Sequence, residues 1–551
     1  MASPNPEVDV MPVLTGAIDA LRAGQLDQAQ RLLSSLLVMP ERPEDAFGVV
    51  TGLAATAGAA DPVDVLRHLL ADQPAAWRIF LCLIPFFAIN RRLDLSFKAL
   101  RFGLVERTTE CEKLAVASLT KVFELGFVET AVELFDYAHD LEPQLLSFGF
   151  FRTALREYLH DHPEAERRRL YRALGDGRAD HLAPESKPYR LDHPERPLTI
   201  GFVNEYASQL VATLVRRLDP KRFRAVAYFD PGRQGVVRLD DVPNLATIDM
   251  MGFTAQQMYD RVVADGIDVL LVVGWGVPAP IYDAIAARPA PIQINWADLG
   301  ARGNPGIDVF LTDAHHVPPG CDDEYDERIV RLPRTSSIFQ PLDAKVTASP
   351  LPCLGGAPFT FGSLNRPSKI NARVAALWAK AMHAVPDSRL LLGFWVYEKF
   401  EPRQRLLKLF AAHGIAPERV EFVQQGDHGS FLDAYRRIDL SLDTFPFNGG
   451  ITTLEASWAG VPVVTLRGEF FGGRLAAGIL RELDLNHLVT HSETEYLDRA
   501  VSLALDRPTL AELRRTVRAR AEASRLWDPV PFAAEWSETV RNLWRDRVSR
   551  G

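Results

Sequence analysis

Cysteine is scarce in this chain of 551 residues. Only four are present, Cys82, Cys111, Cys321 and Cys353, and no two of them form a Cys-x-x-Cys pair. This scatter excludes a disulfide framework and a zinc site built on paired cysteines. The N-terminus also lacks a basic segment followed by an apolar core, so we expect no signal peptide and a cytoplasmic location.

Long apolar runs and excess positive charge are also absent. The most apolar stretch, residues 78–89, is too short for a membrane-spanning helix, which needs about 20 residues, so we expect a buried helix there. Lys and Arg number 62 against 71 Asp and Glu, which gives a net charge of −9. This balance argues against a broad nucleic-acid surface or an anionic-membrane surface.

The length allows roughly three domains, and the first predicted domain, residues 1–185, reads as helical throughout. One spacing of small and apolar residues occurs twice, at Gly24, Ala29 and Leu33 and again at Gly126, Ala131 and Phe135. The two glycines are three tetratricopeptide periods of about 34 residues apart. We therefore expect a degenerate tetratricopeptide-like array, whose concave surface suits a protein partner. A generic helical bundle is the alternative.

Alternating strands and helices follow a polar, proline-containing joint at 181–197. Strands are predicted at 197–206, 223–230, 267–275, 290–300 and 308–315. We predict an α/β architecture of two Rossmann-like lobes with parallel sheets, over 197–345 and 350–525. A closing helix within 526–551 is expected to pack across the lobes. Two such lobes place a ligand at the carboxyl ends of their strands.

The segment 440–466 has the strongest pattern of a ligand site: an apolar strand, a Gly-rich turn, a short helix and a second strand. The residues around the helix start are small or polar: Asn448, Gly449, Gly450, Thr452 and Thr453. A helix N-terminus preceded by glycines presents backbone N–H groups to a phosphate. Glu455, one turn further on, could accept hydrogen bonds from ribose hydroxyls. The alternative is an ordinary β–α turn.

Many positions of this segment match a known signature. The segment resembles the donor-binding region of the O-GlcNAc transferase family of GT-B glycosyltransferases, which includes many bacterial protein glycosyltransferases. The family pattern is L-D-T-x-x-x-N-G, two or three threonines, an acidic residue and W-x-G-x-P-V-V-T-L. The matching residues are Leu442, Asp443, Thr444, Asn448, Gly449, Thr452, Thr453, Glu455, Trp458, Gly460, Pro462 and Thr465. The resemblance covers about 197–525 and is weaker in the first lobe.

A second segment, residues 359–392, resembles the other half of the same lobe, with Asn365 and Lys369 after a strand. In the family, the lysine that matches Lys369 contacts the sugar-nucleotide diphosphate, and a lysine suits a leaving group that gains negative charge. A solvated surface lysine is the alternative. Arg474 could add charge near this site or cap its helix at the surface.

Two further residues, Gln425 and His428, lie where contacts to the nucleotide base are expected, or else form an exposed polar turn.

The acid–base residues depart from the family pattern. The positions where relatives carry histidine are occupied here by Leu210, Leu214 and Gly450, with a fourth near Arg178. Tyr206 stands at the acidic position. Glu205, His181 or the donor phosphate itself are therefore the candidate general bases.

No metal site and no cofactor other than the UDP-sugar donor are expected. The acidic run at 322–327 reads as a solvated loop, and GT-B enzymes commonly stabilise the departing diphosphate with Lys, Arg and backbone amides.

The resemblance implies transfer of GlcNAc or another hexose from a UDP-sugar to a protein side chain, on flagellin or an adhesin by family analogy. The alternatives are a small-molecule or glycolipid glycosyltransferase, a UDP-sugar epimerase, or an inactive UDP-binding protein.

Overall fold

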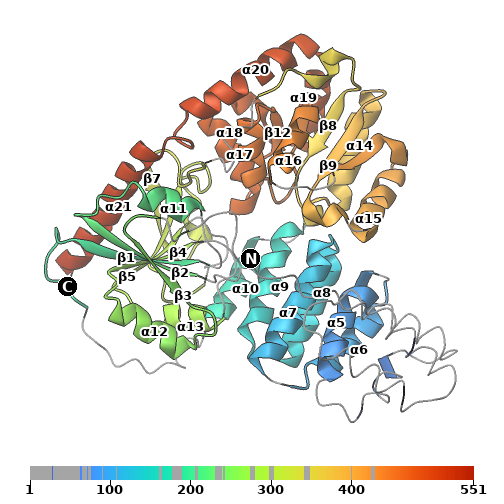
Figure 1. The fold of residues 1–551 in the computed structure, drawn as a ribbon. Helices are drawn as coiled ribbons and strands as arrows, with labels where there is room; N and C mark the ends of the chain where they lie inside the picture. The colour runs from blue at the N-terminus through green and yellow to red at the C-terminus, as the bar shows by residue number, and fades with distance from the viewer. Residues whose placement is uncertain are drawn as a thin grey trace. The chain divides into compact units, whose positions relative to one another are not determined.

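In the computed structural model, the described residues are 76–89, 91–106, 108–159, 164–176, 189–204, 209–229, 239, 242–273, 279–296, 303–340, 348–398, 400–423 and 428–550, with isolated positions before 76. The chain divides into two compact units, Met1–Leu155 and Arg156–Gly551 (Figure 1). None of the described helices combines the length and the apolar character that a bilayer span requires.

The first unit is helical where it is described. Its helices are α5 (Ala76–Ile89), α6 (Leu93–Gly103), α7 (Thr109–Glu124), α8 (Val128–Leu141) and α9 (Leu146–Leu155). Helix α5 packs against α6 and α7, while α8 packs against α6, α7 and α9. This side-by-side stacking of helical pairs is typical of helical repeats. The apolar stretch 78–89 lies in α5 and is largely buried, as expected.

The second copy of the repeated spacing lies at the turn between α7 and α8. Gly126 has φ 97°, a left-handed conformation that favours glycine. Ala131 and Ala138 are fully buried, which allows the helices to approach closely, and Phe135 is buried beside them. These features are consistent with a tetratricopeptide-like domain. The first copy, around Gly24, lies outside the described residues.

The second unit begins with a 3₁₀ turn, η1 (Arg156–Tyr158), and helix α10 (Glu164–Gly175). A Cβ atom on Gly175 would lie 1.7 Å from the carbonyl oxygen of Gly303, and Arg172 Nε donates to Asp326 at 2.8 Å. Helix α10, which the sequence analysis grouped with residues 1–185, therefore packs on the first lobe.

The first lobe is built on a seven-stranded parallel sheet in the order β3-β2-β1-β4-β5-β6-β7. The strands are β1 (Leu198–Asn204), β2 (Phe223–Phe229), β3 (Leu245–Asp249), β4 (Val269–Val273), β5 (Ile292–Trp296), β6 (Val309–Asp313) and β7 (Arg328–Leu332). Its helices are α11 (Gln209–Val215), α12 (Ala255–Ala264) and α13 (Ala279–Ala286). The sequence predicted five of these strands. It missed β3 and β7, whose partly exposed edge positions lack an apolar run.

The second lobe has a six-stranded parallel sheet in the order β10-β9-β8-β11-β12-β13. The strands are β8 (Thr360–Ser363), β9 (Arg389–Gly393), β10 (Val420–Val423), β11 (Leu440–Leu442), β12 (Val463–Leu466) and β13 (Val489–Thr490). The helices are α14 (Ala372–Ala384), α15 (Phe400–Ala411), α16 (His428–Asp433), α17 (Ile451–Trp458), α18 (Leu475–Glu482), α19 (Glu493–Leu505) and α20 (Arg507–Ala523). Both sheets place the first strand of the lobe beside the fourth, which is the doubly wound Rossmann order. The predicted fold class is confirmed.

The last helix, α21 (Pro529–Arg550), returns to the first lobe (Figure 1). Its Phe532, Trp536 and Trp544 are buried in one cluster with strands β1, β2, β4 and β5. Helix α20, by contrast, belongs to the core of the second lobe. The chain thus crosses from one lobe to the other between these two helices.

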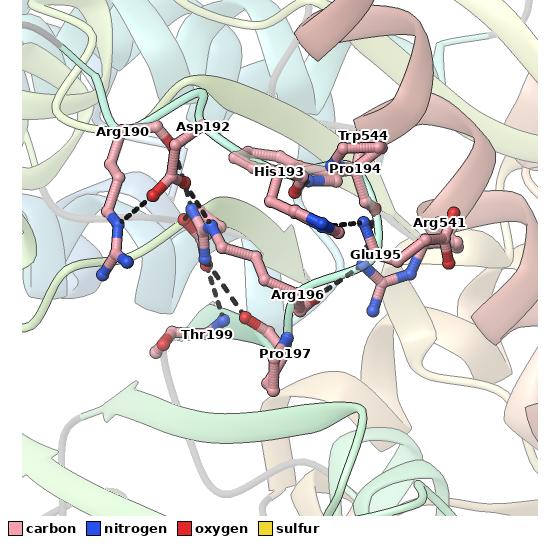
Figure 2. Close-up of polar contacts among 11 residues, drawn as sticks. Arg190, Asp192, His193, Pro194, Glu195, Arg196, Pro197, Thr199, Arg541 and Trp544 are labelled. Carbon is pink, nitrogen blue, oxygen red and sulfur yellow. Dashed lines mark hydrogen bonds and ion pairs between the residues drawn. The ribbon is translucent and has the colours of Figure 1, made fainter.

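Helix α21 also holds the segment that enters β1 (Figure 2). The guanidinium of Arg541 donates to the carbonyls of Pro194 at 3.0 Å and Arg196 at 2.8 Å. The indole of Trp544 donates to the carbonyl of His193 at 3.2 Å, and the Arg196 guanidinium lies 4.7 Å from the Trp544 ring. The predicted polar joint is therefore fixed to the lobe at its C-terminal end.

Candidate functional site

The predicted donor residues meet at the carboxyl ends of two central strands of the second sheet. Strands β8 and β11 are parallel neighbours, with Phe361 opposite Leu440 and Gly362 opposite Ser441. Their carboxyl ends lie side by side at the point where the strand order reverses, which is where open α/β sheets bind ligands. Asn365 and Lys369 follow β8, and the Gly-rich turn 448–450 follows β11.

Direct hydrogen bonds join the two segments. Lys369 Nζ donates to the carbonyl oxygen of Asn448 at 2.6 Å. Thr452 Oγ1 donates to Asn365 Oδ1 at 3.0 Å, and Asn365 Nδ2 donates to Ser363 Oγ at 3.2 Å. The structure therefore brings together four of the predicted residues, which lie far apart in the sequence.

The turn itself is held by a buried carboxylate. Asp443 accepts hydrogen bonds from the backbone N–H of Gly449 at 2.7 Å and from the Thr465 hydroxyl at 2.6 Å. A Cβ atom on Gly449 would lie 2.7 Å from the hydroxyl oxygens of Thr452 and Thr453, so only glycine fits. This packing explains why glycine occupies position 449, two residues before the helix start.

Helix α17 begins without a capping side chain, because Gly450 stands at its N-cap. The first N–H groups of such a helix, together with its positive dipole end, suit an anion. The two threonines of the first turn differ in their contacts. Thr452 bonds to Asn365 across the site, whereas Thr453 Oγ1 donates back to the carbonyl of Gly449 at 3.0 Å.

The electrostatic environment of Lys369 is unusual for a lysine. Burial and the neighbouring Arg366 guanidinium together lower the pKa of Lys369 to about 7, although the Asp443 carboxylate opposes both effects. An arriving diphosphate would favour the charged ammonium and raise this pKa again. Lys369 is thus a half-buried amine beside a positively charged neighbour, and not a solvated surface lysine.

Glu455 is a second residue with a shifted pKa. It lies on the buried side of α17, with 6% of its surface exposed. Burial raises the pKa of its carboxyl to about 8. At neutral pH the carboxyl of the unliganded protein is therefore largely a neutral acid, which can donate as well as accept a hydrogen bond. Tyr435 lies nearby and donates to the Thr452 carbonyl at 2.9 Å.

Arg474 links the second lobe to the first. Its side chain is only 1% exposed, so it is not a surface cap. Its Nη1 atom lies 3.4 Å from the carbonyl oxygen of His316 and 3.5 Å from Glu324 Oε2. The nearby Phe471 ring packs 5.3 Å from the His316 ring, which fixes the 3₁₀ turn η10 (Phe471–Gly473) on the first lobe.

The acidic run forms ion pairs. Asp322 pairs with Arg331 at 2.9 Å, and Asp326 pairs with Arg172 of α10. Across the part of the chain that the structure describes, no group of three or more His, Cys, Asp or Glu side chains is arranged to hold a metal ion.

Glu205, Gln425, Tyr206, Arg178 and His181 lie outside the described residues. For His428 the structure describes only the backbone, at the start of α16.

The positions that match the family histidines carry structural residues where they are described. Leu214 is fully buried in the core of the first lobe, and Leu210 packs against that core. Gly450 is the N-cap of α17.

Sequence reasoning missed three residues next to the predicted lysine. Asp443 matched the motif but was not assigned a role, although a carboxylate at a strand end can bond to the following turn. Phe447 falls on a variable position of the family pattern. Tyr158 stacks on Phe447 from a distant part of the chain, and no local pattern indicates such a contact.

The second unit contains two Rossmann-like lobes. In the second of these lobes, a site suited to an anion lies where the order of the strands reverses. This arrangement is that of a GT-B fold. Residues 343–535 match the model for Glycosyl transferase family 41. The chain is similar over 98% of its length, and of the other chain's length, to the structure of a mutant O-GlcNAc transferase from Thermobaculum terrenum, with a TM-score of 0.76 and 27% identity. The chain is thus similar to O-GlcNAc transferase-like GT-B glycosyltransferases, as the sequence resemblance predicted.

Plant proteins are also similar. A tomato (Solanum lycopersicum) protein described as probable UDP-N-acetylglucosamine–peptide N-acetylglucosaminyltransferase SPINDLY is 30% identical over 372 residues, or 64% of this chain. The Arabidopsis thaliana protein SEC, with the same description, is 27% identical over 314 residues, or 54% of this chain. The matched regions span 39% of the tomato protein and 30% of SEC.

Proposed function

We propose that this chain transfers a sugar, GlcNAc or another hexose, from a UDP-sugar to a side chain of a protein acceptor. The observation that carries the proposal is the contact of Lys369 with the Gly-rich turn that leads into the uncapped start of α17, at the carboxyl ends of β8 and β11. The match of residues 343–535 to Glycosyl transferase family 41 and the activities described for the similar proteins support it.

In the proposed reaction, an acceptor oxygen attacks the anomeric carbon of the sugar while the bond from that carbon to the diphosphate breaks. The departing UDP gains negative charge, which the Lys369 ammonium and the N–H groups of α17 would stabilise. Glu455 would bind the ribose, and Asn365, Thr452 and Arg474 would shape the site. Gln425 and His428 would contact the base, and the acceptor proton would pass to Glu205 or to the donor phosphate.

The helical unit would recruit the acceptor, because stacked helical pairs offer a concave surface for peptides. Flagellin or an adhesin is the proposed acceptor by family analogy, and the proposal includes a cytoplasmic location. Lysine and backbone amides would act on the diphosphate in place of a divalent cation.

A screen of nucleotide sugars tests the proposal. The full chain is incubated with a panel of UDP-sugars, with the matching GDP-sugars as controls, and with candidate acceptor proteins. Free UDP and the intact mass of each acceptor are then measured. UDP release with a matching mass gain on a protein supports the proposal.

The other outcomes identify the alternatives. An epimerised UDP-sugar without UDP release would indicate an epimerase, and sugar recovered on a lipid or small molecule would indicate a different acceptor class. Thermal stabilisation by UDP without turnover of any donor would indicate an inactive binding protein.

A further inference from the structure

An aromatic pair lies directly beside the donor lysine. Tyr158 of η1 and Phe447 of the donor turn stack with ring centroids 4.5 Å apart and an interplanar angle of 14°. Both rings are buried. Because η1 follows α9 without a break in the chain, Tyr158 is covalently connected to the last helix of the helical unit.

Lys369 is placed against one ring of this pair, that of Phe447. Its Nζ atom lies 4.7 Å from the centroid of the Phe447 ring, within the range of a cation–π contact. The amine also donates to the carbonyl of Asn448, the residue after Phe447. The position of the lysine head group is therefore fixed by one ring and one carbonyl of the donor turn.

The Phe447 ring is in turn fixed by the turn η10 and by Phe470. Phe470 lies edge-on to it, with centroids 6.2 Å apart, and a Cβ atom on Gly472 would lie 2.9 Å from the ring. The backbone N–H of Asn448 donates to the carbonyl of Gly472 at 2.9 Å. The guanidinium of Arg167, on α10, lies 4.2 Å from the Phe470 ring. Tyr158 of η1 thus contacts the Phe447 ring, and Arg167 of α10 contacts the Phe470 ring that packs against it.

We propose that Tyr158 and Phe447 are positioning residues for Lys369, so that the segment following the helical unit sets the geometry of the donor-binding amine. The proposal rests on the proposed function in one respect: the ligand that Lys369 neutralises is taken to be the diphosphate of a nucleotide sugar.

The protonation of the amine depends on how well it is shielded from water, because burial is the main cause of its lowered pKa. The charged groups that act on Lys369 are Arg366 of the turn η6 (Pro367–Lys369 with Arg366 at its N-cap) and Asp443 at the end of β11. Burial raises the pKa of Tyr158 to about 12, so its hydroxyl stays neutral and adds no charge. Replacing a ring by leucine would admit water to the amine and raise its pKa toward the ordinary lysine value, although in Phe447→Leu the loss of the cation–π contact opposes part of this rise.

The test uses the full chain and two matched pairs of variants. Tyr158→Leu and Phe447→Leu each remove a ring, whereas Tyr158→Phe and Phe447→Tyr keep it. The first readout is the pH midpoint for modification of the Lys369 amine by an acylating reagent, quantified by peptide mass spectrometry. The second is UDP affinity by calorimetry, and melting temperatures verify folding.

The two leucine variants are expected to shift the labelling midpoint of Lys369 upward by about one pH unit or more and to weaken UDP binding about threefold to tenfold. The ring-keeping variants should behave as the wild type does. A folded Tyr158→Leu variant with an unchanged midpoint and unchanged UDP affinity would overturn the proposal. Should Phe447→Leu fail to fold, Tyr158→Leu decides alone, because its side chain lies outside the donor turn.

The labelling readout needs no nucleotide. If the wild type binds no UDP but its labelling midpoint is low and rises in the leucine variants, the positioning role stands and the proposed function fails. If UDP binds and the midpoint does not respond to the variants, the proposed function stands and the positioning role fails.

Discussion

The protonation of Lys369 predicts a specific pH dependence of UDP binding. In the free protein its pKa is about 7, so about half of the amines are neutral at that pH. Binding of a diphosphate favours the ammonium and raises the pKa, so UDP binding takes up a proton whenever the free amine is neutral. Affinity should therefore fall as the pH rises above 7, by up to about tenfold per unit.

Calorimetric titration of UDP into the full chain at several pH values measures this slope. Lys369→Ala should remove it and weaken binding at pH 7, and with an active enzyme it should lower turnover roughly 10²–10³-fold, or about 2.7–4 kcal/mol of transition-state stabilisation. Lys380→Ala is the matched control, because Lys380 is an exposed lysine on α14. A wild-type affinity that does not change between pH 7 and 9, or a slope that persists in Lys369→Ala, would refute the reasoning.

Four other predictions follow from the same site. Gly449→Ala should lower the melting temperature and UDP affinity, because its Cβ would lie within 2.9 Å of three oxygen atoms, whereas Gly450→Ala, with its nearest contact at 3.6 Å, should have little effect on stability. Glu455→Gln should retain UDP binding below pH 8, where the native carboxyl is already largely neutral, and equal loss at pH 6 and pH 9 would contradict the assigned protonation state. Turnover should persist in excess EDTA, and loss that Mg²⁺ or Mn²⁺ restores would return the run 322–327 to consideration. Deleting residues 1–155 should leave UDP affinity nearly unchanged and weaken transfer to the protein acceptor, provided that the truncated chain folds; an equal loss of both would assign the helical unit a supporting role.

The sequence predicted the parts of the fold that carry strong local patterns. Strands such as β4 are continuous apolar runs because they are covered on both faces. Strand β3, at an edge of its sheet, has mostly exposed side chains and lacks that pattern. An edge strand is stabilised mainly by its hydrogen bonds to the neighbouring strand. The local sequence pattern does not indicate that pairing.

The same distinction applies to the site. Asn365, Lys369 and the turn 448–450 could be identified because they follow strands in a recognisable motif. The Tyr158–Phe447 stack could not, because it depends on a contact between segments almost 300 residues apart, which leaves no periodic signal. Arg474 was identified as a charge near the site, but its burial against the first lobe depends on the packing of η10.

Transfer of a sugar to a protein is the central claim, and one experiment tests it most directly. The purified full chain and its Lys369→Ala variant are incubated with each UDP-sugar and with proteins from the native host, and the acceptors are analysed by mass spectrometry. The account predicts a hexose or N-acetylhexosamine mass gain on an acceptor side chain, with matching UDP release, that the variant reduces at least a hundredfold. UDP binding without any such modification, across all donors, would contradict it.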